Sequence, residues 1–139
     1  MAEFIMKELV RRSGLDERFL IESAAVSTEE IGNGIYPPAK RCLTLHGIPF
    51  DAGKTARQVT PGDYRAFDLL IYMDHSNRRW LDLIMKGNGA NPDPENKFRL
   101  MMSYCNSKFD VADPWYTGDF EATYRDLEEA CAALLRELK

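Results

Sequence analysis

The stretch of sequence that decides the fold is LLIYM, residues 69–73, which leads directly into the polar stretch DHSN, residues 74–77. Five large apolar side chains in a row are too few for a typical helix and suit a strand. A continuous apolar run, as opposed to an alternating one, is typical of a parallel strand that helices cover on both faces. We therefore expect a buried parallel strand at residues 69–73, followed by a helix at about residues 77–86.

Further helices and strands alternate with this strand along the chain. Apolar residues on one face predict a helix over residues 1–12, ending at Gly14, and a long helix over residues 120–138. The start signal TPGD at residues 60–63 predicts another helix. We also expect a loop at residues 27–38, a helix at 38–46 and strands at 18–24 and 98–102. This alternation predicts an α/β fold, a three-layer sandwich with a mostly parallel sheet, whose ligand site lies at the carboxyl ends of the strands.

The composition fits one globular domain of 139 residues and narrows the choice of partners. Hydrophobic residues make up 45% of the chain and charged residues 29%, so one compact core is expected and disorder is not. The net charge is −4 and no basic stripe is present, which argues against a nucleic-acid partner. No apolar run approaches the ~20 residues that span a bilayer, and the N-terminal MAEF has no secretory-signal features. We therefore expect a cytoplasmic protein with no membrane partner.

The three cysteines and two histidines form no recognisable disulfide or metal pattern. Cys42, Cys105 and Cys131 are widely spaced and include no CxxC pair, which argues against a disulfide framework and against a zinc site. No third ligand type clusters near either His46 or His75 in the sequence. We therefore expect reduced thiols, no metal and no cofactor.

The stretch with the most chemistry is DVADPWYTGD, residues 110–119, between the last predicted strand and the last predicted helix. The fold logic places it at the carboxyl edge of the sheet. There, the acid Asp113 could protonate a leaving oxygen while the aromatic rings of Trp115 and Tyr116 sandwich an aryl group. A surface turn with two half-buried aromatics has the same composition. The residues by themselves leave both interpretations open.

A resemblance to a known family favours the catalytic interpretation of this loop over the surface turn. In the same order as here, five stretches resemble the low-molecular-weight protein tyrosine phosphatases, and together they cover the whole chain. They are SAAVSTEEIGN (residues 23–33), HGI (46–48), ARQVT (56–60), MDHSN (73–77) and DPWYTGDF (113–120). The resemblance implies the phosphotyrosine phosphatase I-like fold. It also implies hydrolysis of phosphotyrosine proteins or small aryl phosphates through a cysteinyl-phosphate intermediate.

The resemblance also implies roles for individual residues. The aspartate of the family's DP motif is the general acid and base, which places this role on Asp113. Trp115 and Tyr116 match the aromatic wall around the substrate's phenyl ring, and Tyr36 resembles the variable loop that faces it. Two polar residues at the end of the strand at 69–73 could support the phosphate loop or cap the following helix, and both alternatives stay open. These are Asp74 and Ser76.

One part of the family pattern is absent from the 139 residues. Members of the family open with a hydrophobic strand that runs into Cys-x5-Arg-Ser-Pro, and the N-terminal MAEF resembles the residues that come directly after that proline. None of the three cysteines can substitute, because the residues six positions after them are Ile48, Val111 and Glu137. We therefore expect a single domain over residues 1–139 that is truncated at its N-terminus. We expect it to lack the first central strand, the nucleophile and the phosphate-binding arginine, and therefore to be inactive.

The missing strand has a further expected consequence. In the family it lies between the strands that match residues 18–24 and 68–73, so exposed strand edges would favour a homo-oligomer, a rearranged sheet or marginal stability. Two other functions are compatible with the chain. One is a pseudophosphatase that acts as a binding or regulatory module, and the other is an arsenate reductase, which would need two further cysteines.

Overall fold

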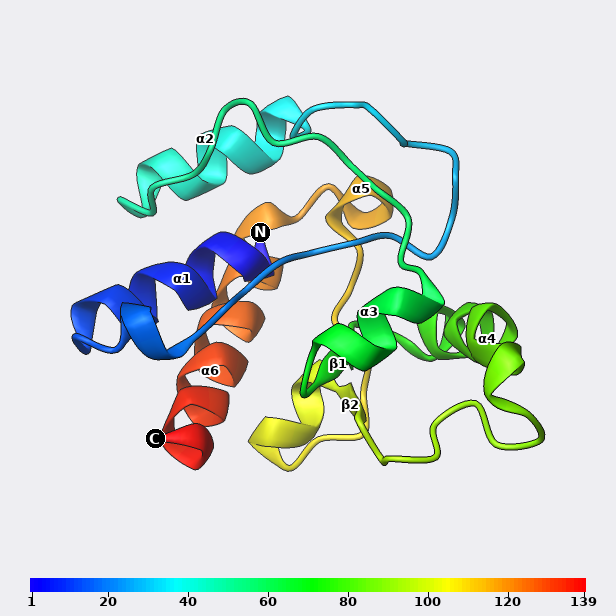
Figure 1. Ribbon diagram of the computed structural model, residues 1–139. Helices are drawn as coiled ribbons and strands as arrows, with labels where there is room; N and C mark the ends of the chain where they lie inside the picture. The colour runs from blue at the N-terminus through cyan, green and yellow to red at the C-terminus, as the bar shows by residue number, and fades with distance from the viewer.

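The computed structural model describes the backbone of residues 1–139 and every side chain except that of Asn88. Figure 1 shows helices on both sides of a short sheet. No helix in the described chain is long and apolar enough to cross a membrane. The helices are α1 (Ala2–Arg12), α2 (Pro37–Leu45), α3 (Pro61–Ala66), α4 (His75–Ile84), α5 (Pro114–Thr117) and α6 (Phe120–Leu138). The strands are β1 (Leu70–Tyr72) and β2 (Phe98–Leu100), and 3₁₀ helices lie at η1 (Asp16–Arg18), η2 (Met85–Asn88) and η3 (Met101–Cys105).

The sheet consists of β1 and β2, which pair in parallel with Leu70 opposite Phe98 and Tyr72 opposite Leu100. The expected α/β class and parallel sheet are confirmed. Both strands are shorter than predicted, since the chain leaves β2 directly into η3. α4 connects the two strands, as a parallel pair requires a crossover.

The alternating side chains of the strand region around β1 belong to two different hydrophobic clusters. On one side, Ile71 packs against a large cluster built mainly from α1, α2 and α6. On the other, Leu70 and Tyr72 pack against a smaller cluster that contains Tyr64 of α3 and Leu81 of α4. Figure 1 shows the same arrangement, with α1 and α6 on one side of the sheet and α3 and α4 on the other. Helices therefore cover both faces, although the β1 side chains are half-buried and not fully buried as predicted.

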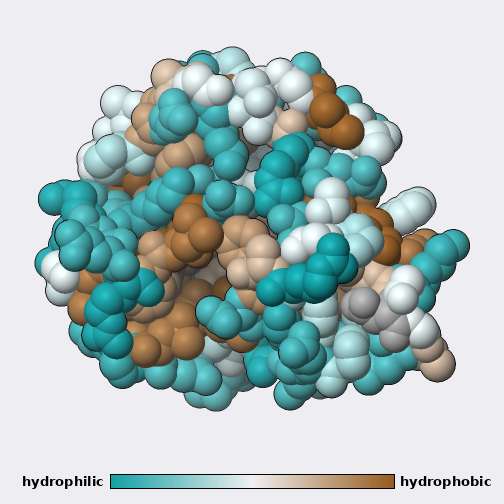
Figure 2. Space-filling view, in the orientation of Figure 1, coloured by the Kyte–Doolittle hydropathy of each residue, from teal (hydrophilic) through white to brown (hydrophobic). Residues whose placement is uncertain are grey.

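The predicted strand at residues 18–24 is not formed. η1 ends at Arg18, and residues 19–24 run extended without a strand partner, until Ala25 makes a single parallel bridge to Gln58. The sheet in the described chain contains β1 and β2, so residues 19–24 lie outside it. Figure 2 shows a hollow with hydrophobic side chains around it in this face of the molecule, between α1 and α3.

The predicted helices form, with shifted ends. α1 ends where Gly14 takes a left-handed backbone conformation, φ +69°, which glycine adopts without steric cost. α3 begins with the predicted capping box of Thr60 and Asp63. α2 begins one residue earlier than predicted, and α4 runs from His75 to Ile84 in place of residues 77–86.

Candidate active site

The loop at residues 110–119 lies at the carboxyl end of β1. The backbone N–H of Val111 donates to the carbonyl of Met73, just after β1, with an N···O distance of 2.9 Å. Next to it, the Asp110 carboxylate accepts from the backbone N–H of His75 at 3.1 Å and pairs with the His75 ring. The loop is therefore attached both to the end of β1 and to the start of α4.

Asp113 is exposed and caps the short helix α5. Its Oδ1 accepts from the backbone N–H of Trp115 at 2.9 Å, and Pro114 occupies the first helical position. The helix ends at Gly118, which has φ +73°. This short turn holds the carboxylate at the surface of the loop, where it can exchange a proton with a bound molecule.

Two of the three predicted aromatic residues are in contact. The ring centroids of Tyr36 and Trp115 lie 4.5 Å apart at an interplanar angle of 49°, and Phe120 lies 6.0 Å from Tyr36. Trp115 is 59% exposed and Tyr116 is 84% exposed. An open pocket of about 510 Å³ lies beside these rings, between α2 and the loop; its lining includes Tyr36, Arg41, Cys42, Pro114, Trp115 and Glu121. The structure thus places Tyr36 against Trp115 beside a pocket, whereas the ring of the next residue, Tyr116, is mostly exposed to solvent.

Asp74 and Ser76 differ in their environment. Asp74 is the N-cap of α4: its Oδ1 accepts from the backbone N–H of Asn77 at 2.7 Å, and the Asn77 side chain returns a bond to the Asp74 backbone. This reciprocal cap explains why α4 begins at His75, earlier than predicted. Ser76 is exposed in the first turn of the same helix.

All three thiols lie in surroundings that favour the protonated form. Burial and the nearby Glu121 carboxylate raise the pKa of Cys42 to about 11, and burial raises the pKa of Cys131 to about 12. Burial likewise raises the pKa of Cys105. A nucleophilic cysteine needs the opposite, a lowered pKa that supplies thiolate near neutral pH.

Sequence reasoning missed a buried carboxylate on the first turn of α1. Burial on its own would raise the pKa of Glu3, but hydrogen bonds from Lys7, Ser23 and Lys54 outweigh it and lower the pKa to about 2. The Lys7 and Ser23 bonds are both 2.6 Å long, and the Lys54 ammonium lies at 3.0 Å. The one sequence signal is the spacing of Glu3 and Lys7, which places them on one helical face; the other two partners come from distant segments.

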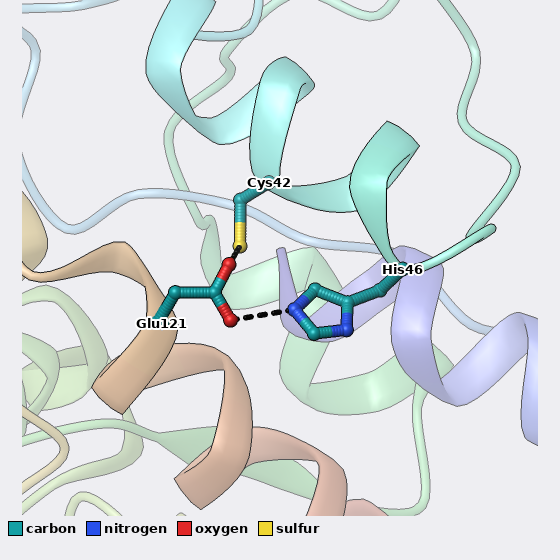
Figure 3. A group of neighbouring side chains, drawn as sticks. All are labelled: Cys42, His46 and Glu121. Atoms are coloured by element: carbon teal, nitrogen blue, oxygen red, sulfur yellow. Dashed lines mark hydrogen bonds and ion pairs between the residues drawn. The ribbon is translucent and has the colours of Figure 1, made fainter.

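A second group that the sequence did not reveal lies between α2 and α6. Cys42, His46 and Glu121 bring a sulfur, a ring nitrogen and a carboxylate within 4.8 Å of one another (Figure 3). Cys42 and His46 are four residues apart, a spacing that places them on one face of α2, but Glu121 comes from a different helix. These are donor types that can hold a metal ion, whereas the sequence led us to expect no metal site.

Fold and site together define an α/β protein whose acidic, aromatic loop lies at the carboxyl end of a parallel strand. The family model of the low molecular weight phosphotyrosine protein phosphatases matches residues 1–139. The phosphatase of this name from Sus scrofa is 35% identical over 142 residues, which cover 100% of this chain and 87% of that protein.

Solved structures agree with this result. The crystal structure of YfkJ from Bacillus subtilis superposes with a TM-score of 0.88 at 31% identity, covering 99% of this chain and 84% of that one. The low molecular weight protein tyrosine phosphatase from Streptococcus pyogenes superposes with a TM-score of 0.83 at 33% identity, covering 99% and 83%. The chain belongs to the low molecular weight phosphotyrosine protein phosphatase family.

Proposed function

We propose that the loop at residues 110–119 takes part in the hydrolysis of aryl phosphate monoesters, either phosphotyrosine in proteins or small aryl phosphates. Asp113 acts as general acid and base, and Tyr36, Trp115 and Tyr116 contact the phenyl ring. The observation that carries this proposal is the arrangement of one short loop. The exposed Asp113 carboxylate accepts from the backbone N–H of Trp115, two residues later, and the Trp115 ring contacts Tyr36 beside an open pocket. An acid next to an aromatic slot fits a substrate with a phenolic leaving oxygen.

The reaction needs a nucleophile as well as this acid. A cysteine thiolate attacks phosphorus, the P–O bond to the phenol breaks, and Asp113 gives its proton to the leaving oxygen. Water then attacks the cysteinyl phosphate, Asp113 takes a proton from it, and phosphate leaves with the thiolate restored. In this scheme Asp113 acts twice and ends in its starting state.

Residues 1–139 do not contain the Cys-x5-Arg sequence that supplies the nucleophile and the phosphate-binding arginine in this family. Their three thiols all have raised pKa values, so none is prepared for attack at neutral pH. We therefore propose that the 139-residue polypeptide by itself does not hydrolyse aryl phosphates. Asp74 and Ser76 would support the phosphate-binding loop only in a chain that carries one.

The test compares two polypeptides. One is residues 1–139; the other carries, directly before Met1, a hydrophobic strand and a Cys-x5-Arg-Ser-Pro segment of the kind that the family resemblance implies. With p-nitrophenyl phosphate and a phosphotyrosine peptide, we expect no turnover from the first and vanadate-sensitive turnover from the second. Saturable, vanadate-sensitive turnover by residues 1–139 would contradict the inactivity of this polypeptide.

The role of Asp113 is tested in the longer polypeptide. Asp113→Asn keeps an oxygen that can cap α5 but cannot donate a carboxylic proton, so kcat should fall by roughly 10²–10⁴-fold. Asp119→Asn is the matched control, because Asp119 is also an exposed N-cap, of α6, and accepts from Ala122 at 3.0 Å. An equal effect of the two substitutions would contradict the assignment of Asp113.

We also propose that residues 1–139 self-associate through β1. Its second edge has no strand beside it in the described chain, and a hollow edged by hydrophobic side chains opens in the face of the molecule that Figure 2 shows. Unpaired strand edges are templates for pairing with another chain. A single monomeric species across the concentration range of a sedimentation-velocity experiment would contradict this proposal.

A further inference from the structure

A cluster of three possible metal ligands, which the proposed hydrolysis does not use, joins α2 to the first turn of α6. The Nε2 atom of His46 lies 2.7 Å from Oε2 of Glu121, and Sγ of Cys42 lies 3.6 Å from Oε1 of the same carboxylate. Figure 3 shows the thiol and the imidazole converging on the carboxylate from one face of α2. One carboxylate is thus approached by a sulfur and a nitrogen, each of which is a metal ligand in its own right.

These separations are close to those in a tetrahedral zinc site. With Zn–S about 2.3 Å and Zn–O or Zn–N about 2.0–2.2 Å, two ligands of one zinc ion lie about 3.3–3.6 Å apart. The Cys42 to Glu121 distance of 3.6 Å already fits. The His46 to Glu121 distance of 2.7 Å must open by about 0.6–0.9 Å. This movement is small for side chains that are 30% and 51% exposed.

The surroundings of the three ligands suit a metal ion in two further ways. The His46 ring stacks on Tyr124, with centroids 3.7 Å apart and planes at 10°, so the orientation of the ring is fixed. The charge is also balanced, since a thiolate and a carboxylate together neutralise a divalent cation next to the buried Cys42. Zinc takes the place of the thiol proton, which is released to water.

An ion can reach the group from solvent. The open pocket beside Tyr36 and Trp115 is also lined by Cys42 and Glu121. Water from this pocket can supply a fourth ligand, as in sites where three protein ligands hold zinc. We propose that Cys42, His46 and Glu121 form a three-ligand site for Zn²⁺ that links α2 to α6 beside the aromatic pocket.

The proposal is tested by titrating the reduced 139-residue protein with Zn²⁺ in a calorimeter and with Co²⁺ in a spectrophotometer. We expect one equivalent of Zn²⁺ to bind, and one equivalent of Co²⁺ to produce thiolate charge-transfer absorption that Zn²⁺ abolishes. Zinc should also raise the melting temperature, because the bound ion links two helices in the folded state only. Absence of saturable binding of either metal would overturn the proposal.

Variants identify the ligands. Glu121→Gln keeps an acceptor for the His46 ring and so preserves the contact between the helices, but removes the anionic ligand. His46→Gln removes the imidazole nitrogen that would bind the metal. We expect each to weaken Zn²⁺ binding at least about tenfold and to remove the zinc-dependent rise in melting temperature. Cys42→Ser should abolish the charge-transfer absorption. If this buried substitution prevents folding, Glu121→Gln and His46→Gln, at the more exposed positions, still show whether these side chains bind the metal.

The matched controls are the thiol and the imidazole outside the group. Cys105→Ser and His75→Gln should leave both the stoichiometry and the affinity unchanged, because Cys105 lies in η3 and His75 pairs with Asp110. Loss of binding in either control, or full binding in both Glu121→Gln and His46→Gln, would place the metal elsewhere and overturn the proposal.

Discussion

The carboxylate of Glu3, buried on the first turn of α1, lies 3.0 Å from the ammonium of Lys54 in a distant turn. Ser23, from the extended segment after η1, donates to the same carboxylate at 2.6 Å. Three segments that are far apart in the sequence are therefore held together by one ionised side chain. A buried charge of this kind stabilises the fold only while it remains ionised and paired.

Stability should therefore depend on pH through Glu3. Its pKa is about 2 in the folded chain, below its ordinary value of 4.5, so the stabilisation is fully present above about pH 4.5 and is lost as the pH falls toward 2. We expect Glu3→Gln to lower the free energy of unfolding at pH 7 by about 3 kcal/mol. The difference from the parent protein should shrink steadily when urea unfolding is repeated at pH 4 and pH 3.

Glu29→Gln serves as the control, because Glu29 is exposed in the loop before α2. It should change stability by less than about 0.5 kcal/mol at every pH. A Glu3→Gln penalty that stayed constant from pH 7 to pH 3 would mean that the ionisation of Glu3 is not what stabilises the fold.

Asp93 should contribute similarly to the other side of the sheet. Its carboxylate accepts from the Tyr64 hydroxyl and the Lys97 backbone N–H, both at 2.7 Å, and from the Phe98 backbone N–H at 3.0 Å. Burial opposes the charged form, but these bonds lower the pKa of Asp93. We expect Asp93→Ala to cost about 2–3 kcal/mol and Tyr64→Phe about 1 kcal/mol in urea unfolding. Equal losses would show that the hydroxyl bond alone matters.

The cap at Asp113 should be visible in the dynamics of its loop. Loss of an N-cap costs about 1 kcal/mol, a factor of about five in local opening. The amide of Trp115 should therefore exchange its hydrogen about five times faster in Asp113→Ala than in the parent, and at nearly the parent rate in Asp113→Asn. This result would separate the structural role of Asp113, which asparagine preserves, from its proposed role as an acid.

Hydrogen exchange at the amide of Ile71 should show whether the second edge of β1 is unpaired. The N–H of Leu70 points toward β2 and donates to the carbonyl of Lys97 at 3.0 Å. Because backbone groups alternate along a strand, those of Ile71 point to the edge that has no strand beside it. In dilute protein, the Ile71 amide should exchange at least about tenfold faster than that of Leu70. Its protection should rise with concentration if chains pair there; equal protection at all concentrations would show that the edge is covered within one molecule.

The elements that the sequence predicted correctly are those decided by local chemistry. The TPGD stretch produces the cap of α3 because Thr60 and Asp63 are only three residues apart, and Gly14 ends α1 through its own backbone freedom. The start of α4 was missed by two residues, because its capping box uses Asn77 in the place where glutamate or glutamine is usual.

The features that sequence reasoning missed depend on partners brought together by the fold. Residues 19–24 have the side chains of a strand, but a strand also requires a neighbour with free backbone groups, and none adjoins them in the described chain. Likewise, Cys42 is the one ligand near His46 in the sequence, and the third ligand, Glu121, is placed beside His46 by the packing of α6 on α2. The site loop was recognised because its acid and its aromatics are contiguous from Asp113 to Tyr116.

The pairing of β1 with β2 has one more consequence, for the accuracy of folding. Side chains at successive positions of β1 enter different hydrophobic clusters, Leu70 and Tyr72 on one side and Ile71 on the other. A slip of one residue would move all three into the wrong cluster at once. A misaligned pairing of this strand is therefore disfavoured even though the strand is only three residues long and makes few hydrogen bonds. The register of β1 also fixes how the two hydrophobic clusters are aligned with each other.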